Sequence, residues 1–294
     1  MKKYNFVFVI LHYIEINETI NFINSIKNLY TDKNINLGIV IVDNNSPNNT
    51  GAILKKKYSS TKNIHVILND KNLGFAKGQN IGFKFAKDNL NPDFIALCNN
   101  DILMIQKDFF EIIISEYEKE HYSLIGPKIL NNDSIQAYSP ILKDERVLKK
   151  ELLKYRILYC MYFLRLDFIR KIYLKIKFLI FKNRNDIRNK YDFDKKKRNV
   201  CLQGSFMIFS KLYIDRFDGI NDKTFFYKEE QFIARRLFKN NMISIYEPKL
   251  YVRHNNGIST ASLNKNERKK NIFIYKNQIY SIKQLLKSIR SNDF

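Results

Sequence analysis

The sequence predicts an α/β fold in which a mostly parallel, Rossmann-like sheet is flanked by helices. Over residues 1–130, short runs rich in β-branched and aromatic residues alternate with segments of helical apolar spacing. The runs are apolar on both faces, as strands are when helices cover both sides of a parallel sheet. The chain of 294 residues, 45% of them hydrophobic, is long enough to bury a large core.

The elements follow in order along the chain. The expected strands of the first half are Phe6–Leu11, Leu37–Val42, Ile64–Leu68, Phe94–Cys98 and Ser123–Ile125. Between the first two, Ile20, Ile23 and Ile26 recur at helical spacing, and Asn17-Glu18-Thr19 can cap that helix. Core-like sequence returns at Phe206–Phe209, in a helix near Glu229–Asn240 and at Ile243–Tyr246. A basic tail from Asn264 to Arg290 is expected to be helical.

The formal net charge of +22 points to an anionic partner. Residues 143–198 contain 19 Lys and Arg against 7 Asp and Glu, interleaved with apolar residues. This pattern predicts one or two basic amphipathic helices, either packed on the core or in contact with a membrane surface. We expect one domain over residues 1–260, with a basic helical segment at about 141–199, followed by a basic helical tail at 261–294.

The cysteines and the apolar runs indicate a compartment. Cys98, Cys160 and Cys201 are scattered, without the spacing of a disulfide framework or a zinc site. No stretch reaches the roughly 18 apolar residues that a membrane span needs. The sequence therefore predicts a cytoplasmic protein, and the basic segment, if it contacts a membrane, would place it peripherally at the inner face of the plasma membrane.

Two expected strands end in carboxylates. Phe94–Cys98 is followed by Asn99-Asn100-Asp101, and Leu37–Val42 is followed by Asp43. Such residues often only begin a turn. However, the carboxyl ends of parallel strands form the ligand-binding edge of an α/β sheet, where Asp101 would hold a metal and a diphosphate.

Three further segments carry candidate chemistry, each with a simpler structural interpretation. Residues 72–82 place glycines every four residues at a helix start, for close approach of an anionic ligand or for helix packing. Glu229-Glu230 in a first helical turn either complements the helix dipole or supplies a general base. His254, beside Arg253 and a glycine-containing loop, is either structural or binds metal or phosphate.

Taken together and in order, these motifs resemble the family 2 inverting glycosyltransferases with the GT-A fold, within a rhamnosyltransferase-like branch. The resemblance covers about residues 5–130 and 200–260. It rests on residues 9–13 (VILHY), 41–46 (IVDNNS), 72–75 (NLGF), 80–82 (NIG), 97–101 (LCNND), 204–207 (GSFM), 226–230 (FYKEE) and 254–259 (HNNGIS).

The resemblance implies a site for a UDP- or dTDP-linked sugar. Nucleotide contacts would come from Tyr13, Asp43, Asn45, Asn72, Gly74, Lys77, Asn80, Asn99 and Asn100. Asp101 and His254 would hold Mg²⁺ or Mn²⁺, and the pair Glu229-Glu230 would contain the base, with Glu230 the first choice. The acceptor would be a cell-surface glycan or a lipid-linked molecule at an anionic membrane surface.

The sequence departs from the family pattern at two points. Asn99 stands where the family's metal motif has its first carboxylate, and Glu230 stands where the base motif more often has Asp.

The alternative of a nucleic-acid-binding protein lacks any recognisable reader motif. A nucleotidyltransferase would need a basic, glycine-rich N-terminal signature, which residues 12–15 (HYIE) do not offer. We therefore expect no nucleic-acid partner.

Overall fold

The computed structural model describes residues 3–29, 34–131, 134–136, 138–139, 142–166, 168, 192–255 and 267–294. Its strands are β1 (Tyr4–His12), β2 (Ile35–Asp43), β3 (Ile64–Leu68), β4 (Phe94–Asn99), β5 (Ile102–Met104), β6 (Leu124–Leu130), β7 (Ile135–Gln136), β8 (Tyr138–Ser139), β9 (Lys197–Arg198), β10 (Cys201–Leu202), β11 (Phe206–Ser210) and β12 (Ser244–His254). Its helices are α1 (Ile16–Leu29), α2 (Thr50–Lys57), α3 (Phe75–Leu90), α4 (Phe109–Glu120), α5 (Glu145–Phe163), α7 (Lys211–Ile214), α8 (Glu229–Lys239) and α10 (Glu267–Ser291).

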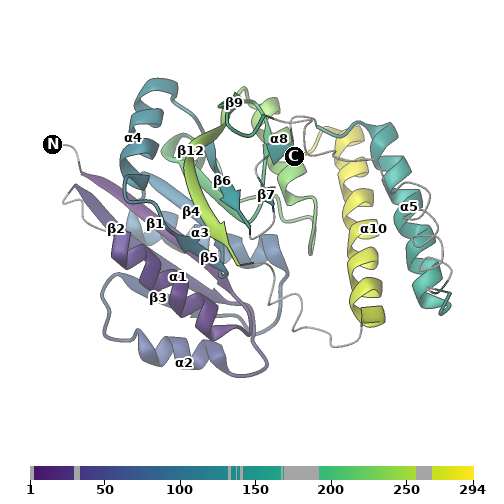
Figure 1. Ribbon diagram of the computed structural model, residues 1–294, viewed down its shortest axis with the longest axis horizontal. Coiled ribbons are helices and arrows are strands. Elements are labelled where there is room, and N and C mark those ends of the chain that lie inside the picture. The colour runs from purple at the N-terminus through teal and green to yellow at the C-terminus, as the bar shows by residue number, and fades with distance from the viewer. Residues whose placement is uncertain are drawn as a thin grey trace.

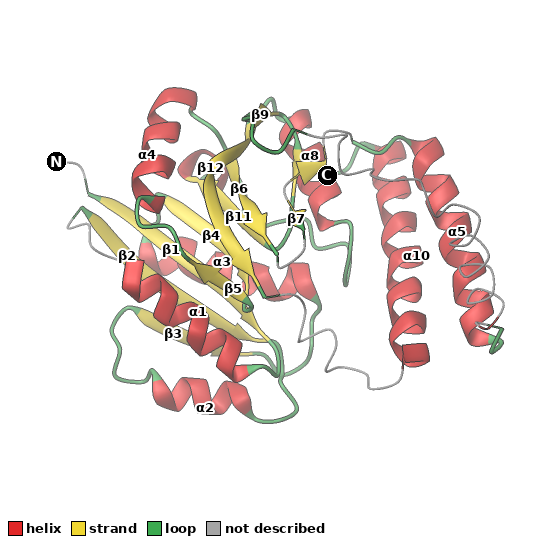
Figure 2. Cartoon of the chain, viewed as in Figure 1, coloured by secondary structure: helices red, strands yellow, loops and turns green. Residues whose placement is uncertain are grey.

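A mixed sheet in the order β3-β2-β1-β4-β11-β6-β12-β5 forms the centre of the protein (Figures 1 and 2). β3, β2, β1 and β4 run parallel to one another, and so do β6 and β12. β11 lies antiparallel between β4 and β6 and joins the two parallel groups. The predicted α/β class is confirmed, and so are all five strands expected in the first half.

Alternate residues of β1 point into two separate cores. Phe6 and Phe8 pack with Phe22 of α1 in one cluster, whereas Val7 and Val9 belong to a second cluster with α3. The two-residue period of a strand divides the side chains in this way. Both faces of the sheet are therefore covered by helices, as the apolar runs predicted.

Helix α1 begins one residue before its expected cap. It starts at Ile16, so Asn17 lies inside the first turn, and the backbone N–H of Thr19 donates to the Glu15 carbonyl. Ile23 and Ile26 are fully buried, as their spacing indicated.

The glycines of α3 are packing residues. A Cβ on Gly78 would come within 2.6 Å of Leu11, and one on Gly82 within 2.3 Å of Val9. The helix can lie this close to β1 only because neither residue has a side chain. For these two glycines the structure favours helix packing over approach to a ligand.

Replacing Gly82 tests this close approach. Gly82→Ala is expected to lower the free energy of unfolding by on the order of 1–2 kcal/mol, because overpacking outweighs alanine's helix propensity. Urea denaturation measures the change. Gly204→Ala is the control, since a Cβ there meets no atom within 4 Å. Equal stability of the two variants would contradict the packing role.

The basic segment forms a helix that pairs with the C-terminal helix. α5 and α10 lie side by side at the end of the molecule farthest from α1 and α2 (Figure 1). Leu148 of α5 packs with Ile282 and Leu285 of α10, and the Arg268 side chain donates to the Tyr162 and Phe163 carbonyls. The rest of the expected basic segment, at 167 and 169–191, and the expected boundary at 260 lie outside the described residues. Among the helices described, none has the length and hydropathy to cross a bilayer.

Candidate active site

Antiparallel pairing brings Asp101 and His254 together from distant parts of the chain. β12 pairs with β5 so that His254 lies opposite Ile102, the residue after Asp101. The Nε2 atom of His254 is 3.0 Å from Oδ1 of Asp101, and the Asn255 N–H donates to the Asp101 carbonyl at 2.9 Å. Both side chains are largely buried. The two residues predicted to hold a metal are therefore neighbours.

A cavity of about 450 Å³ lies beside this pair. Its walls come from the end of β4, the residues before β11, the start of α8, His254 and α10. The lining residues are Phe75, Asn99, Gln203, Gly204, Ser205, Phe226, Tyr227, Lys228, Glu229, Glu230, His254, Phe273 and Gln278. The structure thus places both candidate bases and one candidate metal ligand in one cavity.

Three residues that line this cavity each have a buried polar atom with no hydrogen-bond partner among the described residues. These atoms are Oγ of Ser205, Nδ1 of His254 and Oε1 of Gln278. Burying a polar atom without a partner is costly, so such atoms mark places where a ligand or water completes the bonding. Three of them in one cavity indicate a binding site for a polar molecule. Ser205 and Gln278 were not among the predicted site residues.

The carboxylate pair follows a strained turn. Tyr227 and Lys228 both have positive φ, at 73° and 74°, directly before α8 begins at Glu229. Adjacent non-glycine residues in this region are costly and concentrate at functional sites. The Lys228 ammonium is held 2.9 Å from Oε2 of Glu151 on α5. The turn sets the direction in which both carboxylates leave the helix end.

The two carboxylates differ in their surroundings. Glu229 is buried and accepts a hydrogen bond from Thr224 Oγ1 at 3.0 Å. Burial, together with the neighbouring charge of Glu230, raises the pKa of Glu229 to about 8. Glu230 is only half-buried and lines the cavity. At neutral pH Glu229 therefore keeps its proton, and Glu230 is the more exposed of the two carboxylates.

The raised pKa of Glu229 makes stability depend on pH. Its ordinary pKa is 4.5, so between that value and about 8 the folded state binds more protons than the unfolded state. Stability then falls as pH rises through this window. Glu229→Gln removes this pH dependence. The free energy of unfolding of the variant minus that of the wild type is therefore expected to rise by about 1–3 kcal/mol between pH 5 and pH 8. Urea denaturation at the two pH values measures this, and a constant difference between the proteins would contradict it.

Asp43 and Asn100 are connected through a buried histidine at the end of β1. His12 Nδ1 is 2.7 Å from Thr19 Oγ1, and its Nε2 is 3.9 Å from Oδ1 of Asp43. Asn100 donates to the same Thr19 hydroxyl at 3.2 Å. Burial lowers the pKa of His12 to about 4, so its ring is neutral. The ends of β2 and β4 are thus linked across β1, and the sequence signal for His12 was its place in the VILHY motif.

Three residues of the predicted nucleotide loop bond within the protein. Asn72 accepts from the side chain of Asn44 and from the Gly74 N–H. Gly74 has φ 80°, and a Cβ there would lie 2.4 Å from the Phe225 carbonyl. Asn80 donates to the carbonyl of Ile220 and accepts from its N–H, both at 2.8 Å. These contacts fix the loop against the segment that leads to Tyr227.

The remaining predicted nucleotide residues lie at the same edge of the sheet or near it. Tyr13 follows β1 and is half-buried, Asn45 is exposed after β2, and Lys77 is exposed in the first turn of α3. Asp43 itself is buried and accepts from the N–H and hydroxyl of Ser46. Of the predicted nucleotide set, the structure brings Asn99 into the cavity.

Asp101 and His254 have the chemistry for a divalent cation. Carboxylate oxygen is a ligand that Mg²⁺ and Mn²⁺ prefer, and imidazole nitrogen is a common metal ligand in proteins, so these two side chains would hold the ion together. Among the described residues, no group of three or more His, Cys, Asp or Glu side chains is arranged to hold a metal. A divalent ion held by these two residues would therefore depend on further oxygen donors from outside the described residues, such as phosphate or water.

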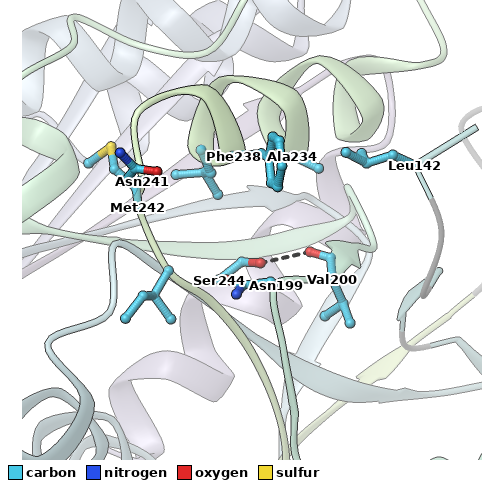
Figure 3. Close-up of a pocket in the computed structure, with 10 residues that line it drawn as sticks. Leu142, Asn199, Val200, Ala234, Phe238, Asn241, Met242 and Ser244 are labelled. Carbon is cyan, nitrogen blue, oxygen red and sulfur yellow. Dashed lines mark hydrogen bonds between the residues drawn. The ribbon is translucent and has the colours of Figure 1, made fainter.

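A second, smaller cavity lies along the later turns of α8 (Figure 3). Its volume is about 260 Å³, and apolar side chains such as Leu237 and Phe238 line much of it. The Ser244 hydroxyl that faces it donates to the Val200 carbonyl at 2.8 Å. None of the predicted catalytic or metal-binding residues lines this cavity.

Comparisons with known proteins give the family and the fold of this chain. The family model described as glycosyl transferase family 2 matches residues 7–174. The low-salt glycan biosynthesis hexosyltransferase Agl10 of Haloferax volcanii is 31% identical over 110 residues, which span 37% of this chain and 34% of that protein.

Solved structures show the same fold. The S. aureus TarS 1–349 structure in complex with UDP has a TM-score of 0.53 and 15% identity, covering 96% of this chain and 72% of that one. Mannosyltransferase PcManGT from Pyrobaculum calidifontis, in complex with GDP-Man and Mn²⁺, has a TM-score of 0.55 and 9% identity, covering 99% and 76%. The predicted GT-A fold is confirmed, and the chain belongs to glycosyl transferase family 2.

Proposed function

We propose that the protein transfers a hexosyl or rhamnosyl group from a nucleoside-diphosphate sugar, UDP- or dTDP-linked, to a hydroxyl of a cell-surface polysaccharide or lipid-linked acceptor, with inversion at the anomeric carbon. We place it on the cytoplasmic side of an anionic membrane surface. The observation that carries the proposal is the single cavity that holds Glu230, Asn99 and His254, with Asp101 bonded to His254. The similarity to a hexosyltransferase, to a structure in complex with UDP and to one in complex with GDP-Man supports the substrate class.

In the proposed reaction, Glu230 accepts the proton of the acceptor hydroxyl. The acceptor oxygen then forms a bond to the anomeric carbon on the side opposite the diphosphate. The bond from that carbon to the phosphate oxygen breaks, and its electron pair leaves with the nucleoside diphosphate. Glu229, protonated at neutral pH, keeps a second negative charge away from the reacting centre. A positioned base of this kind contributes about 10²–10⁴-fold.

Asp101 and His254 would hold Mg²⁺ or Mn²⁺, which supplies positive charge for the diphosphate as it departs. Because a single carboxylate faces the cation, we expect modest metal affinity in the absence of nucleotide. Ser205 Oγ and Asn99, in the same cavity, are available to bond donor oxygens.

A donor screen tests the proposal. The full chain is incubated with UDP-, dTDP- and GDP-linked sugars, with and without Mn²⁺, and release of the nucleoside diphosphate is measured. We expect release from at least one donor class, and a higher rate with Mn²⁺. If none of these donors is bound or hydrolysed under either condition, the proposed function is wrong.

A further inference from the structure

One side of α5 exposes large apolar side chains that the chemistry above does not use. Leu153 is 60% exposed, Ile157 52% and Leu164 61%. Leu153 and Ile157, four residues apart, lie on one stripe of the helix, and Leu164, seven residues further on, directly follows the last helical residue. Phe163, 59% exposed, and Leu166 extend the apolar surface at the helix end. Single exposed apolar residues are ordinary, whereas a continuous group marks an interaction surface.

Basic side chains flank the same stripe. We call this surface the α5 outward face, defined by Arg146, Lys150, Leu153, Lys154, Ile157 and Leu164, all exposed. The two carboxylates of α5 are paired with other cations: Glu145 with Lys149 and Arg290, and Glu151 with Lys143 and Lys228. The face therefore combines apolar area with positive charge, as interfacial helices do.

The opposite side of α5 is fixed to the rest of the protein. Leu148 is fully buried against α10, and Tyr162 is 2% exposed beside Tyr275. Glu151 bonds Lys228, which precedes the catalytic carboxylates. α10 in turn contributes Phe273 and Gln278 to the cavity. Whatever binds the outward face is thus held at a fixed position relative to the active-site cavity.

We propose that the α5 outward face binds the surface of a bilayer that contains anionic lipid. Lys and Arg are attracted to the negative headgroups, while Leu153, Ile157 and Leu164 enter the boundary with the acyl chains. A nucleic acid would contact the basic side chains of this face but would leave its apolar stripe unused, because leucine and isoleucine offer neither a donor to phosphate nor a flat ring on which a base can stack. The proposed membrane contact is argued from the side chains of α5 alone. That this contact also presents the cavity to a lipid-linked acceptor rests on the proposed function.

Vesicle flotation tests the proposal with the full chain. We expect the protein to float with vesicles of phosphatidylcholine and phosphatidylglycerol, and far less with phosphatidylcholine alone. Arg146→Gln/Lys150→Gln/Lys154→Gln should lower partitioning on the order of 100-fold, since each cation near the surface contributes about fivefold. Leu153→Ser/Ile157→Ser/Leu164→Ser should also release the protein, because its apolar contact is lost.

Matched controls come from α2, which lies away from α5 (Figure 1). Lys55→Gln/Lys56→Gln/Lys57→Gln removes the same charge from exposed positions, and Ile53→Ser removes a side chain that is 51% exposed. Both should float like the wild type. Thermal unfolding by circular dichroism checks that every variant is folded.

Three results would overturn the proposal. One is equal flotation of the α5 and α2 variants. Another is that the α5 variants bind vesicles like the wild type but have a lower molar mass in solution, which would assign the α5 outward face to a contact between copies of the chain. The third is that the α5 variants lose binding to RNA while they float with the vesicles like the wild type. Nucleoside-diphosphate binding by calorimetry is measured on the same proteins, so a failure of the proposed function is seen separately from a failure of membrane docking.

Discussion

Glu230→Gln is expected to lower kcat for sugar transfer by about 10³-fold while leaving the affinity for the nucleoside diphosphate unchanged. Glutamine keeps the size of the side chain and its place in the cavity wall but cannot accept the proton of the acceptor hydroxyl. Steady-state kinetics with the donor found by the screen, together with calorimetry, measure the two quantities. The loss should appear in kcat because the proton moves only in the reacting complex.

Glu229→Gln is the matched control for this variant. Since Glu229 is already protonated at neutral pH, the substitution should cost far less activity there. In the wild type, activity should change near pH 8, where Glu229 loses its proton beside Glu230, and the control should lack that change. Equal losses for the two variants at neutral pH would contradict the assignment of Glu230 as the base.

Asp101→Ala is expected to remove Mn²⁺-dependent binding of the nucleoside diphosphate, weakening it at least 10–100-fold, as is typical when a metal site is disrupted. Asp101 is 3% exposed and supplies the carboxylate beside His254. Calorimetric titration of the nucleotide, with Mn²⁺ and with EDTA, measures the effect. The wild type should bind more tightly with Mn²⁺, and the variant should bind equally in both.

Loss of a buried carboxylate can also affect folding, so a second substitution accompanies it. Asp101→Asn keeps the shape and an oxygen acceptor for His254 while removing the charge. It should melt like the wild type and still lose most of the Mn²⁺ effect. A Mn²⁺ effect that persists in both variants would show that the cation is held elsewhere.

The sequence predicted those helices and strands that depend on a local pattern of residues. β3 has the bounds expected from its apolar run, and β1, β2 and β4 differ by at most two residues at either end, whereas β6 ends five residues later than expected. β1 extends to His12, a polar residue that a hydropathy pattern excludes from a strand. It is buried there because Thr19 and Thr50 bond both of its ring nitrogens. These hydrogen bonds come from α1 and α2, so the residues of the strand alone do not predict them.

The parts of the site that the sequence did not predict come from long-range contacts. α10, expected as a basic tail outside the main domain, supplies Phe273 and Gln278 to the cavity wall. Asn80, expected at the nucleotide, bonds Ile220, which lies 140 positions away in the chain. β11 enters the sheet antiparallel and places Ser205 beside Asn99. None of these pairings leaves a periodic or local pattern.

The most direct measurement is a crystal structure of the full chain with Mn²⁺ and the nucleoside diphosphate selected by the donor screen, located by the anomalous signal of manganese. We predict one strong peak within bonding distance of Asp101 Oδ1 and His254 Nε2, with the diphosphate in the cavity beside Glu230. Nucleotide bound in the smaller cavity along α8, or a manganese peak away from Asp101 and His254, would contradict it.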